Sequence, residues 1–363
     1  MIKYPMVRLE DVCDKATSSI AQKDLKNLEG IYPIYGASGF IKNINFYKQD
    51  REYIAIVKDG AGIGRAMILP AFSSVIGTMQ YILPKDNIIT KYLYFAIDSM
   101  NLAKYFTGAT IPHIYFKDYK NEFLPLPPIE NQRSIIKILE SIVSLIIKRK
   151  QQLSEFDELA KSRFLEMFGD PISNSKGWEI TKLEDLGELS RGISKSRPRN
   201  LPELLGGKYP LVQTGDVANS ELYITRYNST YSELGLKQSK MWKAGTLCIT
   251  IAANIAKTAI LKFDACFPDS IVGFKSNGKT NQIFIHYIFS FFQELLESQA
   301  PTVAQKNINL QTLQNLMVIC PPSKFQNDFE SFIQQLDKSK FRIKKSLEKL
   351  EMTYKALLQE YFG

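Results

Sequence analysis

The chain has 363 residues, which is enough for two or three domains that each bury a sizeable core. An apolar content of 45% and a charged content of 23% are ordinary for a folded protein and exclude a disordered or low-complexity chain. The net charge of +9 favours an anionic partner, of which nucleic acid comes first, but many basic proteins bind no DNA, so charge alone leaves both classes open.

The first 127 residues have the pattern of a mixed α/β module. Residues Tyr53 to Val57 form a continuous apolar run that predicts a buried strand, and Ala66 to Leu69 predict another. Between them lies a glycine-rich stretch, 60–64, which has neither the GxGxxG nor the GxxxxGK[ST] spacing of nucleotide-binding loops. A backbone turn, or a close approach of backbone to DNA phosphate, explains these glycines better. Residues Tyr92 to Met100 predict a helix.

A long helix is predicted after the Pro127-Pro128 pair. Apolar residues recur alternately every four and three residues from Ile135 to Met167, which is the heptad pattern of a coiled coil. The prolines mark the start of this helix, and Gly169 followed by Asp170-Pro171 marks its end. Residues 129–168 would therefore span about 60 Å of helix, within a helical segment that we place at 128–170.

The second half of the chain repeats this order. A globular part at 171–322 contains predicted strands at Thr246 to Ile251 and Thr258 to Leu261 and a predicted helix at Phe284 to Leu296. A second heptad pattern runs from Phe329 to Tyr361, inside a helical segment that we place at 323–363. We expect each long helix to bury its apolar stripe against the other, as an antiparallel pair.

The two halves match residue by residue. Leu9 corresponds to Leu183 with a shift of 174 residues, whereas Pro128 corresponds to Pro322 and Phe168 to Phe362 with a shift of 194. The second globular part is thus longer by 20 residues, while the helices keep step without a gap. This pattern predicts an internal pseudo-twofold repeat. The loops of the globular parts can differ in length, whereas a helix that pairs with another helix must keep its length.

Three charged residues interrupt the two heptad patterns: Arg149, Arg163 and Lys340. One interpretation is that their charged ends reach solvent from the edge of the seam. The other is that they fix the register in which the two helices pair. The sequence leaves both open.

The four cysteines, Cys13, Cys248, Cys266 and Cys320, are scattered and form no CxxC pair. We therefore expect small core residues in a reducing cytosol, with neither a disulfide framework nor a metal site. The N-terminus has no apolar stretch typical of a signal peptide, and the longest apolar candidate, 283–292, is interrupted by His286 and is too short to span a bilayer. These features predict a cytoplasmic protein that does not contact a membrane.

No catalytic residue is expected in this chain. The Pro-Pro pairs do not continue as the Asn/Asp-Pro-Pro-Phe/Tyr motif of amino-methyltransferases, and Pro268-Asp269 is not followed by the Asp/Glu-x-Lys of a metal-dependent nuclease. The chain has two histidines: His286 lies in an apolar stretch and is expected in a core, and His113 is expected at the surface. Neither has a visible nucleophile or metal partner in the sequence.

Basic, amide and hydroxyl residues in predicted loops are the candidates for DNA contact, because arginine can bridge guanine and asparagine or glutamine can bridge adenine. The alternative for each is an ordinary solvated surface residue. The candidates are Lys58, Arg65, Thr110, His113, Arg191, Lys195, Arg197, Arg199, Gln213, Thr214, Asn254, Lys257, Gln305, Lys306 and Asn307.

The repeated motifs resemble those of type I restriction–modification specificity subunits over essentially the whole chain. The module start Trp178-Glu179-Ile180-Thr181-Lys182-Leu183, the element from Leu124 to Gln132 and the Phe-Gly ends of both helices carry the resemblance. The first module has Tyr4 in place of the tryptophan, and the second has Cys320 and Ser323-Lys324 where the family pattern differs.

The resemblance implies an α/β (α+β) fold in which two target-recognition domains are separated by two long antiparallel helices. It implies recognition of a bipartite, asymmetric site in double-stranded DNA, with the helices fixing the gap between half-sites. It further implies two modification subunits that methylate adenine with S-adenosylmethionine, and restriction subunits that use ATP and Mg²⁺; this chain itself would hold no cofactor. The alternatives are a coiled-coil interaction scaffold that does not recognise DNA sequence, and an enzyme with an unrecognised site.

Overall fold

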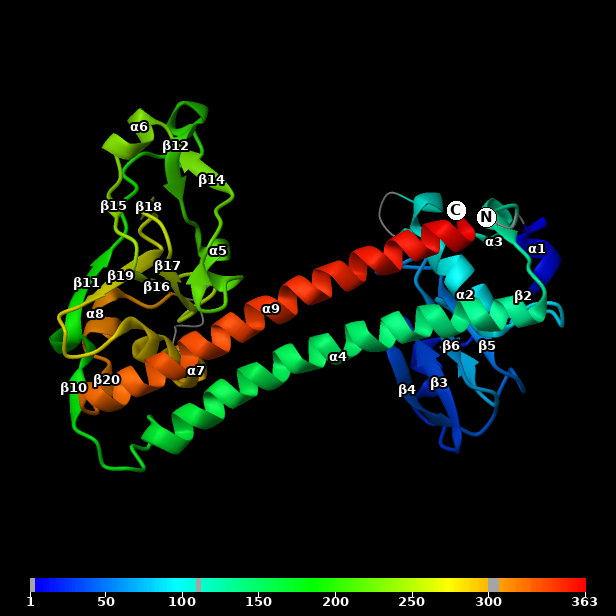
Figure 1. Ribbon diagram of the computed structural model, residues 1–363, viewed down its shortest axis with the longest axis horizontal. Coiled ribbons are helices and arrows are strands. Elements are labelled where there is room, and N and C mark those ends of the chain that lie inside the picture. The colour runs from blue at the N-terminus through cyan, green and yellow to red at the C-terminus, as the bar shows by residue number, and fades with distance from the viewer. Residues whose placement is uncertain (1–3, 109–111, 300–306) are drawn as a thin grey trace. The chain divides into compact units, whose positions relative to one another are not determined.

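The computed structural model describes residues 4–108, 112–299 and 307–363 (Figure 1). The fold is mixed helix and strand, as predicted, and comprises two compact units. Unit 1 is Met1–Gln152 together with Ile343–Gly363, and unit 2 is Leu153–Arg342. Each long helix therefore contributes residues to both units, while the predicted division into recognition domains and helical spacers stays a prediction. No helix of the described residues is long and apolar enough to cross a membrane.

Unit 1 contains two sheets and a short strand pair. Its strands are β1 (Met6–Arg8), β2 (Cys13–Thr17), β3 (Tyr32–Gly36), β4 (Gly39–Ile44), β5 (Tyr53–Val57), β6 (Ala66–Leu69), β7 (Ser74–Val75), β8 (Met79–Pro84) and β9 (Phe123–Pro125). Its shorter helices are α1 (Leu9–Val12), η1 (Gln22–Leu25), α2 (Thr90–Ser99), η2 (Leu102–Tyr105) and α3 (Phe116–Tyr119). The strand orders are β2-β8-β5-β6, β4-β3-β7 and β1-β9. Every residue of β5 is buried, which is why its sequence is a continuous apolar run.

Unit 2 repeats this arrangement with additions. Its strands are β10 (Ile180–Lys182), β11 (Gly187–Arg191), β12 (Leu205–Leu211), β13 (Tyr223–Ile224), β14 (Ser229–Tyr231), β15 (Met241–Trp242), β16 (Leu247–Thr250), β17 (Thr258–Leu261), β18 (Ala265–Cys266), β19 (Ile271–Ser276) and β20 (Met317–Ile319). Its shorter helices are η3 (Leu183–Leu186), η4 (Pro202–Leu204), α5 (Thr214–Ala218), α6 (Glu233–Lys237), α7 (Gln282–Gln299) and α8 (Leu310–Gln314). The strand orders are β11-β19-β16-β17-β13, β14-β12-β18-β15 and β10-β20.

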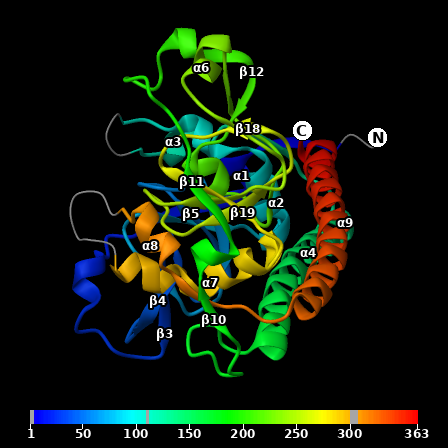
Figure 2. The ribbon, with the colours of Figure 1, turned by 90° about the vertical axis from the view of Figure 1, so that its left-hand side faces the viewer.

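The internal repeat is visible in strand pairing. In unit 1 Val7 of β1 faces Leu124 of β9, and in unit 2 Thr181 of β10 faces Val318 of β20. These positions differ by the two shifts of 174 and 194 residues found in the sequence. In unit 2 β13 and β15 extend the two sheets, and they lie in the part of the chain that is longer by 20 residues. Figures 1 and 2 show the β12–α6 part at the opposite end of unit 2 from α7.

The predicted strands and helices of the modules are found with small shifts at their ends. Three predicted strands, 53–57, 66–69 and 258–261, have the bounds of β5, β6 and β17. The predicted strand 246–251 is shorter: β16 spans Leu247–Thr250, and Thr246 N donates to Lys243 O in the turn before it. Helix α7 is longer at both ends than predicted, and α2 begins two residues earlier than predicted.

The two long helices are α4 (Ile129–Phe168) and α9 (Ser323–Phe362), each of 40 residues. All heptad positions in both helices are buried or half-buried. In unit 2 Lys340 contacts Asp157 while Phe332 contacts Arg163, so α9 runs back along α4 in antiparallel orientation. In unit 1 the first turns of α4 and the last turns of α9 enter one core, which also fits antiparallel pairing. Apolar seams thus stabilise each pair of helix segments.

A buried glutamine joins each long helix to its module. The side-chain amide of Gln132 accepts from Ile89 N at 2.9 Å and donates to Pro127 O at 2.9 Å. At the equivalent place Gln326 accepts from Asn281 N at 3.3 Å and donates to Pro321 O at 2.7 Å. Both side chains are almost fully buried, so these bonds satisfy main-chain groups that water cannot reach. This role explains why a glutamine follows the proline pair in both halves.

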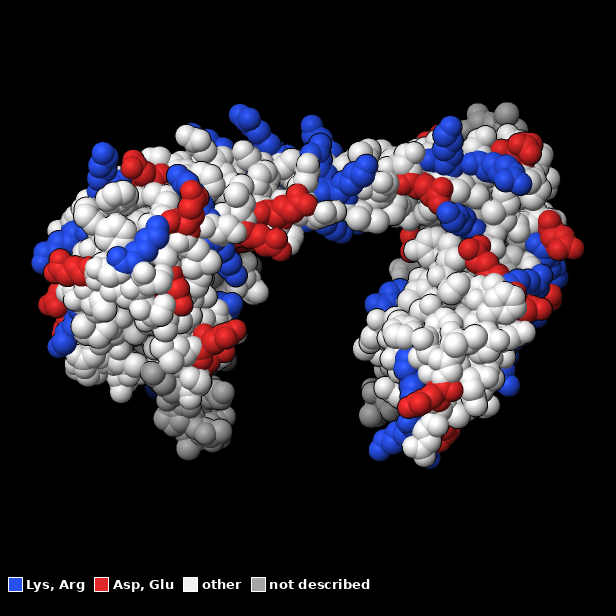
Figure 3. All heavy atoms as spheres, turned by 90° about the horizontal axis from the view of Figure 1, so that it is seen from below, with Lys and Arg blue, Asp and Glu red and all other residues white. Residues whose placement is uncertain are grey.

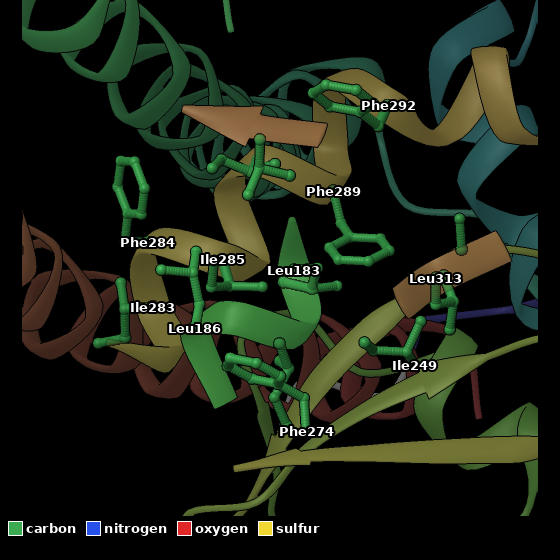
Figure 4. Packing of buried hydrophobic residues seen from close by; sticks show 14 of the residues in the cluster. Leu183, Leu186, Ile249, Phe274, Ile283, Phe284, Ile285, Phe289, Phe292 and Leu313 are labelled. Carbon is green, nitrogen blue, oxygen red and sulfur yellow. The ribbon is translucent and has the colours of Figure 1, made fainter. Parts of the chain in front are cut away.

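The core of unit 2 forms around α7. Ile285 and Phe289 of this helix lie beside Leu183 of η3 (Figure 4), and the same buried cluster includes Phe284 and Ile249 of β16. Phe164 and Phe168 of α4 join the same cluster through aromatic contacts, including a 4.9 Å edge contact between Phe168 and Phe284. The end of α4 is therefore fixed to the module by its large apolar side chains. Three of the four cysteines are buried, as predicted, and Cys320 is half-buried.

Candidate nucleic-acid interface

The loop between β5 and β6 in unit 1 places the first predicted contact residues. Its three glycines, Gly60, Gly62 and Gly64, have φ values of 84°, 82° and 79°, a conformation that favours glycine. A Cβ on Gly64 would lie 2.6 Å from Ala103 N, so this position has no room for a side chain. The glycine-rich stretch is therefore a tight turn, which agrees with the first of its two predicted explanations.

A second segment lies against this loop and brings three polar residues together. Ile114 N donates to Lys58 O at 2.9 Å, and Thr107 and His113 exchange two main-chain hydrogen bonds of 2.8 Å. Nδ1 of His113 lies 2.7 Å from a carboxylate oxygen of Asp59, and Nζ of Lys58 lies 3.5 Å from the other. The sequence indicated no partner for His113; the structure supplies one that is 54 residues away.

Unit 2 has the same arrangement with different residue types. Ile308 N donates to Ile251 O at 3.0 Å, and Ala252 forms an isolated bridge with Asn307, as Asp59 does with His113. In place of glycines this loop has Ala253 and Ala256 at φ values of 64° and 60°. Left-handed backbone at non-glycine residues costs free energy and concentrates at functional sites.

The equivalence pairs several predicted residues across the units. His113 and Asn307 hold the same position beside the loop, with the shift of 194 residues that relates the two helices. Arg65 and Lys257 also correspond, because their carbonyls accept from Val57 N and Thr250 N, each at 2.9 Å. The guanidinium of Arg65 donates in addition to Ala37 O, which ties it to the β3–β4 turn. The same two segments therefore carry candidate contacts in both units, and unit 2 has further candidates elsewhere.

A cavity of about 810 Å³ opens beside this loop in unit 2. Four predicted residues line it: Arg191, Arg199, Thr214 and Asn307. The remaining lining residues had not been predicted as DNA contacts; they are Ile251, Ala252, Ala253, Asp269, Ser270, Ile308, Asn309 and Thr312. The lining is rich in hydrogen-bond donors and acceptors, which suits base edges and phosphate oxygens better than an apolar ligand.

Asp269 hydrogen-bonds to three arginines, of which Arg191 and Arg199 line this cavity. Its main-chain carbonyl accepts from Nε of Arg191 at 2.8 Å. Its carboxylate accepts from Arg197 Nη2 at 3.2 Å and from Arg199. The sequence singled out Asp269 as half of a nuclease motif and missed this role, because the three arginines lie 70 to 78 residues away in the chain.

The other predicted residues of unit 2 lie in different local settings. Gln213 precedes α5, and its side chain donates to Ser229 at 3.3 Å. The main chain of Lys195 donates to Gln238 O at 3.3 Å, and the carbonyl of Asn254 accepts from Thr250. Three of the predicted contacts, Thr110, Gln305 and Lys306, lie outside the described residues.

Lys257 lies at a second cavity of about 370 Å³, which is lined by α4, α7 and α9 within unit 2. His286 lines this cavity and contacts Thr258 Oγ1 at 2.9 Å through Nδ1. Burial of the imidazole and the nearby ammonium of Lys340 lower the pKa of His286 to about 4. The prediction that His286 belongs to a core holds only in part: the residue is half-buried at the edge of this cavity, and its imidazole stays neutral near pH 7.

On one face of the described residues, basic side chains do not form an uninterrupted surface (Figure 3). On the face shown in Figure 3, Lys and Arg lie among Asp and Glu in both units. Local clusters such as the three arginines at Asp269, and not the net charge of +9, define the candidate interface.

Comparison with protein families gives a match over most of the chain. The model described as "Type I restriction modification DNA specificity domain" matches residues 1–155 and 175–352. The two matched segments cover the two halves that are related by the internal repeat.

Individual relatives agree with this match. The chain is 23% identical to the type I restriction enzyme MjaIX specificity subunit of Methanocaldococcus jannaschii, over 93% of this chain and 84% of that protein. It is 20% identical to a putative type I restriction enzyme specificity subunit of Haemophilus influenzae, over 92% of this chain and 86% of that protein. Its fold resembles a crystal structure of the S subunit of a type I restriction–modification system from M. genitalium, with a TM-score of 0.58 at 15% identity, covering 100% of this chain and 96% of that one.

Proposed function

This chain belongs to the family of type I restriction–modification DNA specificity domains, and we propose that its two units each read one short segment of a bipartite, asymmetric DNA site. Its role is sequence specificity without catalysis. One observation carries the proposal of two half-sites: the same loop and adjoining segment occur in both units with different side chains at equivalent positions. His113 and Asp59 in unit 1 stand where Asn307 and Ala252 stand in unit 2.

The chemistry of these positions supports unequal half-sites. Arginine matches the N7 and O6 acceptors of guanine, and asparagine matches the N6 and N7 edge of adenine. Because Arg65 corresponds to Lys257 and His113 to Asn307, the two units offer different donors and acceptors to a base pair. Two different half-sites follow.

The long helices suit two further roles. Residues of α4 and α9 belong to both units, so the length of the helices would set the gap between half-sites. Both helices also expose large apolar side chains along their length, at Ile138, Leu145, Ile147, Leu159 and Leu165 of α4 and at Phe341 and Met352 of α9. Exposed apolar side chains of this number favour a protein partner, and we assign this surface to two modification subunits.

The chemistry of the complex would then reside in those partners. Modification subunits would bind S-adenosylmethionine and methylate adenine, and restriction subunits would use ATP and Mg²⁺. The role of this chain is to place them on the DNA. A coiled-coil scaffold without DNA recognition is disfavoured, because the family match covers the globular parts as well as the helices.

Mapping methylated adenines in the source genome, with and without this gene, tests the proposal. Loss of one bipartite motif is the expected result and would identify both half-sites at once. If no motif changes, selection of duplexes from a random library by the purified chain becomes the deciding measurement. Failure to enrich any sequence there would refute DNA recognition by this chain.

A further inference from the structure

We propose that the 810 Å³ cavity of unit 2 reads a G·C base pair and that Arg191 is the residue that recognises the guanine. The main-chain carbonyl of Asp269 orients that arginine. The inference rests on the proposed function and adds to it a base, a residue and a half-site. It requires that the Arg191 side chain be oriented before DNA binds and that its hydrogen-bonding edge face the cavity.

The main chain of Arg191 is fixed on both sides. Arg191 is the last residue of β11 and pairs with Val272 of β19. The next residue, Gly192, donates to Ile271 O at 2.8 Å, and a Cβ on it would lie 2.3 Å from the carbonyl oxygens of Phe267 and Pro268. Only glycine allows β11 to lie this close to the segment that carries Asp269. A site built on such a strand is more precise than one on a free loop.

The side chain of Arg191 is held by one of its nitrogens and presents the others. Nε donates to the carbonyl of Asp269 at 2.8 Å, which fixes the plane of the guanidinium. The two Nη atoms of the guanidinium form the edge that faces away from Nε, and they carry four of its five N–H donors. Since Arg191 lines the cavity, this edge is available to a ligand there. The spacing of such a fork matches the N7 and O6 acceptors that guanine presents in the major groove.

The carboxylate of Asp269 would repel DNA if it were unpaired. It is instead bonded to Arg197 Nη2 and to Arg199. Arg197 also donates through Nη1 to Ser194 O and Ser196 O, at 2.5 and 2.9 Å. Both Nη atoms of Arg197 therefore bond to groups of the protein itself. The three arginines and one aspartate together keep a net charge of about +2. The cluster therefore remains attractive to DNA while one arginine stays oriented.

The equivalent position of unit 1 holds a different type of residue. In the internal repeat Arg191, at the end of β11, corresponds to Thr17 at the end of β2, with the shift of 174 residues. Threonine cannot present a fork of two donors. The guanine read in this way is accordingly expected in one half-site only.

The test compares the full chain with its R191Q and R191K variants in selection from a random duplex library at fixed salt, and in methylation maps of strains that carry each variant gene. We expect a guanine in one half-site of the wild-type motif. R191Q lowers the preference for that guanine about fivefold to 150-fold and leaves the other positions unchanged. R191K keeps the charge, so it weakens the preference with little change in the salt dependence of binding.

R226Q is the matched control, because Arg226 is exposed in unit 2 and does not line the cavity. It should leave the motif as in the wild type, and the melting temperatures of all variants should agree. Equal weakening at every position by R191Q would mean that Arg191 contacts phosphate, and an unchanged motif would mean that it contacts no base; each overturns the inference. A wild-type chain that selects no motif refutes the proposed function itself, which separates the two failures.

Discussion

Lys340 of α9 donates a hydrogen bond to Asp157 of α4 across the helix seam of unit 2. The lysine side chain is 10% exposed, whereas that of the aspartate is 60% exposed. A buried ammonium with one carboxylate partner tolerates little sliding of one helix along the other. This pair favours the register-setting interpretation for Lys340. Arg163, by contrast, packs over Phe332 and pairs with Glu166 on its own helix, as a residue at the edge of a seam does.

Removing the aspartate should destabilise unit 2. Asp157→Ala leaves the ammonium of Lys340 buried without its carboxylate, which should lower the free energy of unfolding by about 1–3 kcal/mol in urea titrations. Lys340→Met should cost less, because it removes the buried charge as well. Glu351→Ala is the control: the Lys150–Glu351 pair is exposed, so its loss should cost less than about 1 kcal/mol. Equal effects of the two alanine variants would contradict the role given to Lys340.

The two buried glutamines predict a second stability effect. Gln326→Leu leaves Asn281 N–H and Pro321 C=O without their partner, and the cost should be about 1–3 kcal/mol. The equivalent change at Gln132 should cost a similar amount. Gln335, exposed on the same helix as Gln326, provides the control, and its change to leucine should stay within about 0.5 kcal/mol. Thermal unfolding of the three variants measures the difference. A Gln326→Leu variant as stable as the wild type would contradict the role of this glutamine in joining the helix to its module.

His286 predicts a pH dependence of stability. In the unfolded chain the imidazole takes up a proton near pH 6.5, whereas in the folded protein its pKa is about 4. Between these values the unfolded state binds more protons, so the free energy of unfolding falls as the pH falls, by up to about 3 kcal/mol. His286→Asn should remove this part of the pH dependence of the free energy of unfolding. Urea titrations at several pH values measure it as the difference between wild type and variant; parallel curves would show that His286 does not contribute.

The equivalent positions beside the two loops predict separate effects on the two half-sites. His113→Ala should alter base preference in one half-site, and Asn307→Ala should alter it in the other. Loss of a direct base contact should reduce the preference about fivefold to 150-fold at the position concerned. Selection from a random duplex library measures both, and each variant serves as the control for the other. Changes in the same half-site would show that the two units do not read DNA separately.

The length of the helices predicts the gap between half-sites. Insertion of four residues at facing points of α4 and α9 adds about 6 Å to each helix and keeps its apolar stripe almost in phase. The recognised gap should lengthen by about one to two base pairs, given ~34–36 Å per turn of DNA. Insertion into α4 alone should instead disrupt the pairing and lower stability. Methylation maps report the gap directly. An unchanged gap after the paired insertion would refute the proposal that helix length sets the gap between half-sites.

The sequence by itself determined the repeat, the long helices and the broad nature of the candidate site. Heptad spacing and proline pairs are local signals, so the first helix was predicted at 129–168, which are the bounds of α4, and the second within 323–363, where α9 spans Ser323–Phe362. The buried strands followed from continuous apolar runs for the same reason. The shifts of 174 and 194 residues located the equivalent parts of the two halves before their strand pairing was known.

Only the tertiary structure decided which polar residues meet. Asp59 and His113 lie 54 residues apart, and Asp269 lies 70 to 78 residues from the arginines that it holds. Such contacts depend on sheet order and loop conformation, which no local pattern encodes. For that reason Lys257 and Arg191 were equal candidates for DNA contact in the sequence analysis, whereas the fold places them at different cavities. No sequence pattern indicated that the main-chain carbonyl of Asp269 holds Arg191, because the two residues are 78 positions apart in the chain.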